Sequence, residues 1–440
     1  MVDRAAAADV ETDAARVPGF RRLLAILGGS AGNLVEWYDW FAYASFAIYF
    51  APVFFPKGDQ TAQLLQAAAV FAVGFFARPV GAWVMGLVAD RAGRRVSLAA
   101  AVAMMCVGSL MAALTPGFAT IGPAAPAILT AARLVQGFSL GGQYGVSATY
   151  LSEMAGRTQR GFWSSFQFVT LIGGQLAALA VLIVLQHLLS SAALAAWGWR
   201  VAFGVGAGLA LGVFAVQLRL DETHSFTASR AAGAPRAQTW LLVTRHPRET
   251  AIVFALSGAG GLGFYAFTTY MQPFLTNSGR FSKSQATEIT ALSLVGYLAV
   301  LPVFGWLGDK VGRRALLATA FGLLTLFTWP ILVSLVRQTN EVAALALVFA
   351  CLVLMSGYSS MSAVVKAELF PAHLRGLGVA LPYALANALF GGTAEWVALW
   401  FKQVRLESGF FAYMSLVFAI AFLVAVRMRD TQKESRILED

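Results

Sequence analysis

About twelve apolar stretches, each long enough to cross a bilayer as a helix of about 20 residues, follow one another along this chain. Only 12% of the 440 residues are charged, whereas soluble globular chains carry roughly 25%. Helices satisfy their own backbone polar groups in lipid, and no stretch alternates like the strand of a membrane barrel. The sequence therefore predicts an all-α membrane protein with twelve transmembrane helices. The expected spans lie near residues 22–50, 63–89, 96–115, 124–152, 160–187, 199–218, 250–275, 286–308, 315–336, 342–365, 376–401 and 408–426.

The basic residues are distributed unevenly between the loops. If both termini lie in the cytoplasm, the basic residues expected outside are Lys57, Arg200, Arg280, Lys283, Arg337, Lys402 and Arg405. Arg78 and Arg133 fall within spans, and all the others lie on the cytoplasmic side. This positive-inside pattern predicts a multi-pass protein with cytoplasmic termini and accounts for the net charge of +10. We therefore expect the lipid bilayer, and no nucleic acid, as its large partner.

An internal repeat divides the chain into two halves. The pattern Gly-x-x-x-Asp-Arg/Lys-x-Gly-Arg-Arg occurs at residues 86–95 and again at residues 305–314, after the second and the eighth expected spans. Glu153 and Glu368, in the loops two spans later, are each followed by an arginine at the same spacing. Matching loops of this kind predict two pseudo-symmetric six-helix bundles. We expect a cytoplasmic tail at 1–20, bundles at 21–218 and 248–427, a cytoplasmic linker at 219–247 and a second cytoplasmic tail at 428–440.

The repeated loops supply charges for a gate on the cytoplasmic side. Asp90 and Asp309 can cap a neighbouring helix N-terminus, while the arginines of the loops can pair with Glu153 and Glu368. Such a cluster would hold the halves together when the protein opens outward and must break when it opens inward. The alternative is that the arginines only set the topology. The expected gate residues are Asp90, Arg94, Arg95, Glu153, Arg160, Asp309, Arg313, Arg314, Lys366, Glu368 and Arg375.

Four ionisable side chains fall at membrane depth in the N-terminal half: Glu36, Asp39, Arg78 and Arg133. Such groups are functional candidates by default, because an unpaired charge is costly in lipid. A guanidinium matches a carboxylate in a bidentate fork, so we expect Arg78 to bind a substrate carboxylate. The alternative is a structural ion pair with Glu36 or Asp39. A carboxylate beside an arginine stays ionised until a substrate competes for that arginine, so Asp39 and Arg133 are candidates for proton coupling, unless they form a permanent bridge.

Several segments of the sequence resemble those of a known protein family. The paired loops resemble the signature loop of the major facilitator superfamily, and residues 133–137 resemble its R-x-x-Q-G motif. More narrowly, the chain looks like the metabolite:proton symporter family on residues 32–39, 76–81, 141–145 and 197–200. Within that family, residues 165–175, 267–271 and 366–371 resemble the α-ketoglutarate permeases.

The resemblance implies a secondary active transporter of the bacterial inner membrane that imports a small carboxylated metabolite, such as an α-ketoglutarate-like dicarboxylate, together with protons by alternating access. Alternatives are another organic or aromatic acid or a betaine-type zwitterion. We expect a monomer with a small organic anion as substrate, protons as coupling ion and no cofactor or metal. We expect no enzyme, because the sequence contains no P-loop, metal-ligand cluster or nucleophile–base spacing, and no channel, because it contains no filter-like segment. The expected substrate-binding residues are Arg78, Arg133, Gln167, Gln175, Tyr265, Tyr270, Tyr383 and Asn387.

Gln143 departs from the family pattern. Members usually carry Gly-Gly-Glu-Tyr-Gly, where this chain has Gly-Gly-Gln143-Tyr-Gly. If a glutamate there normally carries the coupled proton, this chain would be a proton-uncoupled uniporter or exchanger. Alternatively, the position only packs and the change is silent. The candidates for proton coupling are therefore Glu36, Asp39, Arg133 and Gln143.

Overall fold

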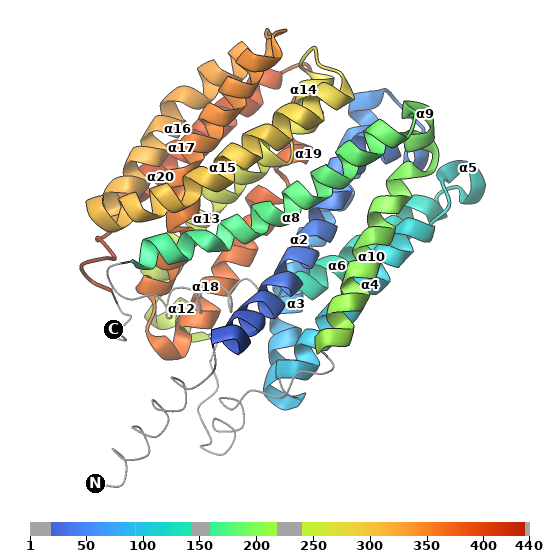
Figure 1. The fold of residues 1–440 in the computed structure, drawn as a ribbon. Helices are drawn as coiled ribbons and strands as arrows, with labels where there is room; N and C mark the ends of the chain where they lie inside the picture. Colours follow the sequence, from blue (N-terminus) through green and yellow to red (C-terminus); the bar gives the residue numbers. More distant parts are fainter. Residues whose placement is uncertain (1–18, 93, 142–158, 218–239, 436–440) are drawn as a thin grey trace.

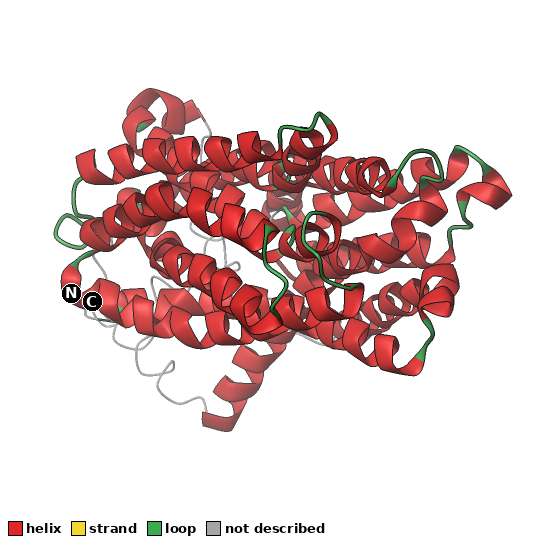
Figure 2. Cartoon of the chain, turned by 90° about the horizontal axis from the view of Figure 1, so that it is seen from above, coloured by secondary structure: helices red, strands yellow, loops and turns green. Residues whose placement is uncertain are grey.

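Helices are the only regular elements in the described part of the computed structural model, which covers residues 19–92, 94–141, 159–217 and 240–435 (Figures 1 and 2). The N-terminal half contains α2 (Gly19–Phe54), α3 (Gln60–Ala92), α4 (Arg94–Leu114), α5 (Phe118–Ile121), α6 (Ala124–Leu140), α8 (Arg160–Leu188), α9 (Ser191–Ala193), the π-helical turn η1 (Leu194–Gly198) and α10 (Trp199–Gln217). The C-terminal half contains α12 (Trp240–Arg245), α13 (Pro247–Thr268), α14 (Met271–Asn277), α15 (Lys283–Val311), α16 (Arg313–Val336), α17 (Glu341–Leu369), α18 (Ala372–Ala386), the π-helical turn η2 (Asn387–Gly391), α19 (Ala394–Gln403) and α20 (Glu407–Arg427).

Within the described ranges, nine helical segments are long and apolar enough to cross a membrane. They coincide with the expected spans other than the first, third and fourth. Those three correspond to α2, whose side chains are described only from Leu34, and to the shorter apolar helices Ala99–Leu114 and Ala124–Leu140. The prediction of an all-helical membrane protein is confirmed. The expected linker at 219–247 falls largely on residues outside the described ranges, so its boundaries stay a prediction.

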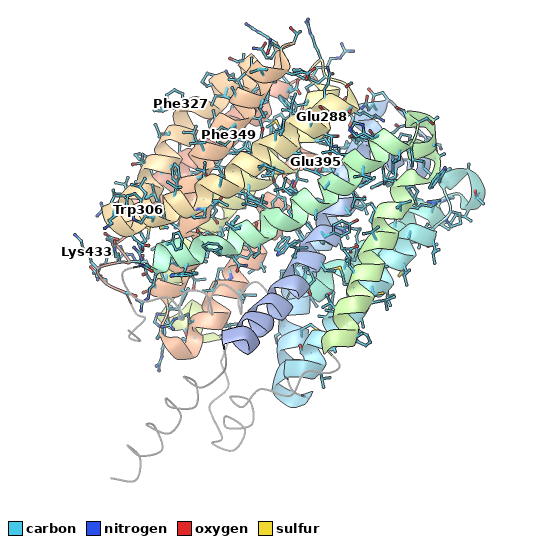
Figure 3. The ribbon with its side chains drawn as sticks, in the orientation of Figure 1. Glu288, Trp306, Phe327, Phe349, Glu395 and Lys433 are labelled. Carbon is cyan, nitrogen blue, oxygen red and sulfur yellow. The ribbon has the colours of Figure 1, made fainter. Side chains whose placement is uncertain are left out.

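Large apolar side chains cover the periphery of the bundle. Trp306 is 53% exposed and Phe327 47% exposed, and Figure 3 shows both on the outer side of their helices. Leu292 and Leu416 are exposed as well. An apolar surface of this extent is not tolerated in water, so this surface faces the hydrocarbon of the bilayer.

The two halves meet along α8 and α15, which run side by side through the middle of the molecule (Figure 1). Near one end of this pair, the backbones approach so closely that a Cβ atom on Gly305 would lie 2.7 Å from the carbonyl oxygen of Gly161. Gly305 is the first glycine of the second repeated loop pattern. Small residues allow membrane helices to pack backbone against backbone, so this glycine permits the close approach of the halves.

A second close approach joins α3 to α6 within the N-terminal half. A Cβ atom on Gly141 would lie 2.1 Å from the carbonyl oxygen of Arg78 and 2.5 Å from the amide nitrogen of Ala82. One turn earlier, a Cβ atom on Gly137 would lie 1.9 Å from the carbonyl oxygen of Gly74. These glycines hold the backbone that carries Arg78 against α6.

We expect Gly141→Ala to destabilise the protein by about 1–3 kcal/mol, because the added methyl group forces α3 and α6 apart. Gly208→Ala is the matched control, since nothing lies within 4 Å of a Cβ atom at Gly208. The measurement is thermal unfolding of the detergent-solubilised protein. Equal melting temperatures for the two variants would contradict the packing argument.

Candidate functional site

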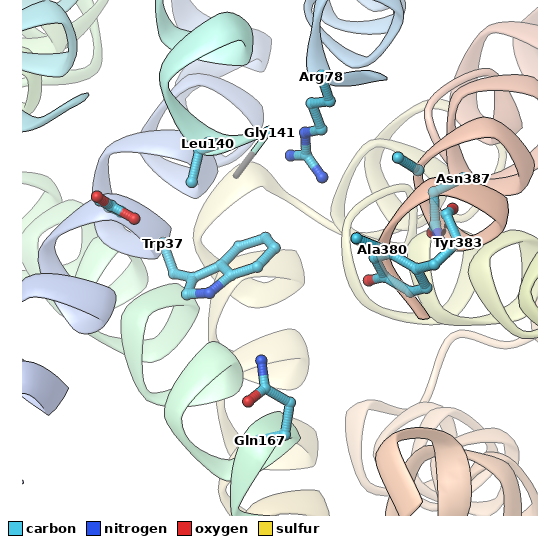
Figure 4. A pocket seen from close by; sticks show the side chains of 10 residues that line it. Trp37, Arg78, Leu140, Gly141, Gln167, Ala380, Tyr383 and Asn387 are labelled. Carbon is cyan, nitrogen blue, oxygen red and sulfur yellow. Dashed lines mark hydrogen bonds between the residues drawn. The ribbon is translucent and has the colours of Figure 1, made fainter. Parts of the chain in front are cut away.

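A cavity lies between the two halves, lined by four helices of the N-terminal half and by α18 and η2 of the C-terminal half (Figure 4). Its volume is about 20 Å³. This is room for about one water molecule, so a substrate must widen the cavity. The lining residues are Glu36, Trp37, Arg78, Leu140, Gly141, Gln167, Ala380, Tyr383, Ala384 and Asn387.

Arg78 provides a positive charge in the cavity wall. Its guanidinium carbon lies 4.0 Å from the ring centroid of Trp40 and 4.0 Å from that of Phe75, while Nε and Nη2 are buried without a hydrogen-bond partner. Among the described residues, no ion pair joins Arg78 to Glu36 or Asp39. Aromatic faces attract a cation, but they leave its N–H donors open to an anion.

Arg133 is fully buried and does not line the cavity. Its Nη1 donates to Oε1 of Gln136 at 2.7 Å, and Nε2 of Gln136 donates to Oδ2 of Asp39 at 2.5 Å. Oγ of Ser109 donates to the other carboxylate oxygen of Asp39 at 2.5 Å. The permanent Arg133–Asp39 bridge that the sequence left open is therefore replaced by a relay, in which the amide of Gln136 separates the two charges.

The ring of Trp40 connects the two arginines. The guanidinium carbon of Arg133 also lies 4.0 Å from the Trp40 centroid, and 4.6 Å from that of Tyr43. Trp40 is fully buried. The same indole thus contacts the cation that lines the cavity and the cation that belongs to the Asp39 relay.

Of the other expected substrate-binding residues, Gln167, Tyr383 and Asn387 line the cavity. Gln175 does not, because eight residues of helix place it about 12 Å from Gln167 along α8. Tyr265 lies in the aromatic packing behind the wall, with its ring 5.0 Å from that of Phe75.

Tyr270 also lies away from the cavity. It follows the end of α13 and borders a separate apolar pocket that contains Phe274 and Phe410. The expected grouping of Tyr270 with the substrate-binding residues is therefore not found in this conformation. Gln143 lies outside the described residues.

Lys366 was expected in the gate near Glu368, but its side chain points elsewhere. Two residues of an α-helix are separated by about 200° around its axis, so Lys366 and Glu368 occupy opposite faces of α17. The ammonium group of Lys366 donates to Oγ of Ser362 at 2.7 Å and to Oη of Tyr358 at 3.4 Å. It also lies 4.2 Å from the ring centroid of Tyr383. Lys366 therefore belongs beside the cavity and not in the gate.

The end of the bundle where the repeated loop pattern lies, here called the motif end, is closed by charged contacts between the halves. The carboxylate of Asp309 accepts hydrogen bonds from the backbone amides of Gly161 and Phe162, both at 2.9 Å. It also pairs with Arg313 at 2.9 Å, and Arg313 lies 3.6 Å from Glu368. Asp309 of one half thus caps the N-terminus of α8 in the other half, where a negative charge is favoured.

Two expected gate arginines have other partners. Arg314 donates to the carbonyl oxygen of Val426 at the end of α20, and among the described residues it forms no ion pair with Glu368. It follows Arg313 directly, which turns it about 100° away from Glu368. Arg375 donates to the carbonyl oxygen of Phe370. The side chains of Asp90, Arg94, Arg95 and Glu153 lie outside the described part of the chain.

Residues of the expected C-terminal tail contact the motif end. Nε2 of Gln432 donates to the carbonyl oxygen of Asp309 at 2.9 Å, and Nη1 of Arg160 donates to Oγ of Ser435 at 3.5 Å. Thr431 is buried. These contacts add a third segment to the junction of the two halves.

The opposite end, here called the far end, is closed by neutral and singly charged contacts that the sequence did not indicate. Nε2 of Gln186 donates to Oη of Tyr49 at 2.8 Å and to Oγ1 of Thr287 at 3.2 Å. Nζ of Lys283 donates to the carbonyl oxygen of Ile48 at 2.8 Å. Gln186, Tyr49 and Ile48 belong to the N-terminal half, and the other two residues to the C-terminal half. The described residues therefore join the two halves at both ends of the cavity.

Known transporters resemble this chain in sequence and in fold. A family model described as "Sugar (and other) transporter" matches residues 24–251, and the model "Major Facilitator Superfamily" matches residues 253–439. The α-ketoglutarate permease of Escherichia coli is 46% identical over 95% of this chain and 96% of its own length. The citrate-proton symporter of Klebsiella pneumoniae is 33% identical over 85% of this chain and 84% of its own length. A crystal structure of a D-xylose-proton symporter, 19% identical, superposes with a TM-score of 0.75 over 93% of this chain and 98% of that one, which shows the same fold.

We expect Gln136→Leu to destabilise the protein by about 3–5 kcal/mol, because it leaves the buried charges of Arg133 and Asp39 without their shared partner. Ser139→Ala on the same helix is the control. It removes one neutral bond from Ser139 to the carbonyl oxygen of Ala101, which is worth about 1 kcal/mol. Thermal unfolding in detergent compares them, and a Gln136→Leu variant as stable as Ser139→Ala would show that the relay is not structurally important.

Proposed function

Because the chain belongs to the major facilitator superfamily, we propose that it is a proton-coupled symporter that imports a small dicarboxylate of the α-ketoglutarate type across the bacterial inner membrane. The observation that carries the substrate class is the open guanidinium of Arg78 in the wall of the cavity. The high identity to an α-ketoglutarate permease over nearly the whole chain supports the same substrate. A monomer suffices, since one chain forms the entire cavity.

Arg78 is the proposed anchor for one substrate carboxylate. Its free donors can form a bidentate pair, which is strongest where water is scarce. The rings of Trp40 and Phe75 exclude water and hold the guanidinium plane without consuming its N–H groups. Gln167 and Asn387 add amide donors on opposite walls for the remaining oxygens of the substrate. A zwitterion such as a betaine fits less well, because it has no net negative charge to offset the charge of Arg78.

Asp39 is the proposed carrier of the coupled proton. It is fully buried and held by Ser109 and Gln136, so its protonation state responds to the electrostatic field of the nearby arginines. A substrate anion at Arg78 partly cancels that field and favours the protonated acid. With Gln143 unable to ionise, proton coupling rests on Asp39 and on Glu36, one helical turn away on α2.

Alternating access then consists of opening one closed end at a time. From the distribution of basic residues we place the motif end in the cytoplasm and the far end outside. Inward opening would break the contacts of Asp309 with the N-terminus of α8. Outward opening would break the contacts of Thr287 and Lys283 with the N-terminal half.

We expect Arg78→Ala to weaken binding of α-ketoglutarate by about 2–5 kcal/mol, because the substrate carboxylate loses its charged partner. Arg280→Ala, at an exposed position, is the control and should bind normally. The measurement is equilibrium binding of labelled α-ketoglutarate to the purified protein, followed by uptake in proteoliposomes. Unchanged binding by Arg78→Ala would remove the proposed anchor.

We expect Asp39→Asn to abolish uphill accumulation driven by a pH gradient while exchange of internal for external substrate continues, since an amide cannot carry the proton. Glu288→Gln is the matched control, a carboxylate-to-amide change on the exposed side of α15 (Figure 3). Both activities are measured in the same proteoliposomes. If Asp39→Asn still accumulates substrate, another group carries the proton, and Gln143→Glu in the same assay tests whether position 143 contributes.

A further inference from the structure

Lys366 lies directly behind the C-terminal wall of the cavity. It is 1% exposed although its backbone belongs to the last turn of α17, and its ammonium group lies 4.2 Å from the ring centroid of Tyr383. Tyr383 itself lines the cavity, and it comes from the other half of the molecule than Arg78 (Figure 4). One aromatic ring therefore separates this lysine from the space in which Arg78 is exposed.

The surroundings of Lys366 hold the ammonium group near that wall. Ser362 and Tyr358 lie one and two helical turns earlier on α17, and both hydroxyls accept hydrogen bonds from Nζ. The lysine stem thus runs back along its helix, away from the motif end and toward the cavity. An ionisable side chain at this depth is a functional candidate, and the gate role first expected for it does not account for this direction.

The ring of Tyr383 has to turn aside before the ammonium group can meet a substrate. Ala380 and Ala384, on the same helix, line the cavity with it. Lysine is a point charge on a flexible four-carbon stem, so Nζ can reach the cavity once the ring turns aside. The cavity has to widen for any substrate, and this movement is one way in which it can.

We propose that Lys366 binds the second carboxylate of the substrate, so that a dicarboxylate spans the two halves from Arg78 to Lys366. This inference rests on the proposed function. It names Lys366 as the residue that distinguishes dicarboxylates from monocarboxylates. A monocarboxylate engages Arg78 alone, whereas a dicarboxylate engages both cations and draws the halves together. Selectivity for two carboxylates and closure around the substrate then have the same physical origin.

The test compares binding of α-ketoglutarate and of 2-oxopentanoate, which lacks the distal carboxylate, to the purified full-length protein. Lys366→Met keeps the length of the side chain and removes its charge. We expect it to weaken α-ketoglutarate binding about tenfold or more while changing 2-oxopentanoate binding less than about twofold. Arg78→Ala should weaken both ligands. Lys433→Met, an exchange of the same kind in the C-terminal tail (Figure 3), should leave both affinities unchanged.

A second variant keeps the test decisive if Lys366→Met does not fold. Lys366→Arg retains the charge on a longer side chain, which shortens the distance to Arg78. It should therefore shift preference from α-ketoglutarate toward oxaloacetate, which is one carbon shorter. An unchanged preference in Lys366→Arg would overturn the inference.

The outcomes separate this inference from the function on which it rests. If the wild-type protein binds α-ketoglutarate through Arg78, and Lys366→Met lowers both affinities equally or neither, the second anchor is wrong and the proposed function stands. A change in the pH dependence of uptake with an unaltered ratio of affinities would also overturn it, and would make Lys366 a proton-coupling residue. If the wild-type protein binds no dicarboxylate, both proposals fail.

Discussion

The packing of the N-terminal half depends on two buried guanidinium groups. Those of Arg78 and Arg133 both lie against the indole ring of Trp40. A charge at this depth is unfavourable unless it is paired, hydrogen-bonded or hydrated. Arg133 meets that requirement in part, through one hydrogen bond to Gln136, which also binds Asp39, and through the rings of Trp40 and Tyr43. Arg78 meets it only in part, through the rings of Trp40 and Phe75. In both arginines Nε and Nη2 are buried without a hydrogen-bond partner. Only Arg78 lines the cavity, so only its donors can meet an anion that enters there.

The two ends of the bundle are closed by interactions of different strength. At the motif end a carboxylate accepts from two backbone amides and pairs with Arg313, and charge-assisted bonds of this kind are roughly twice as strong as neutral ones. At the far end the bonds between the halves join an amide to a hydroxyl and a lysine to a carbonyl oxygen. Each end therefore contains an ionised group that loses its partner in the other half when that end opens, Asp309 at the motif end and Lys283 at the far end.

The sequence predicted the depth of most candidate residues but not the direction of their side chains. The all-helical membrane fold and the family were predictable, because span length and the repeated loops fix both. The position of Arg78 relative to its neighbours was not, because the aromatic rings that hold it come from two helices. Lys366 was assigned to the gate from its proximity in sequence to Glu368, although the two side chains lie on opposite faces of α17. Gln186 and Thr287 gave no signal at all, since single polar residues near helix ends are common and their contact joins segments 101 residues apart.

Glu36 and Asp39 are one helical turn apart on α2, yet they occupy different environments. Glu36 lines the cavity, whereas Asp39 is fully enclosed by its relay. A carboxylate in the cavity repels an approaching anion and must be neutralised, or must move, when the substrate binds. A carboxylate behind the wall experiences the substrate only through the field that Arg78 and Arg133 transmit. On the proposed function, this separation allows Asp39 to gain its proton in response to binding without touching the substrate, so a glutamine at position 143 need not abolish coupling.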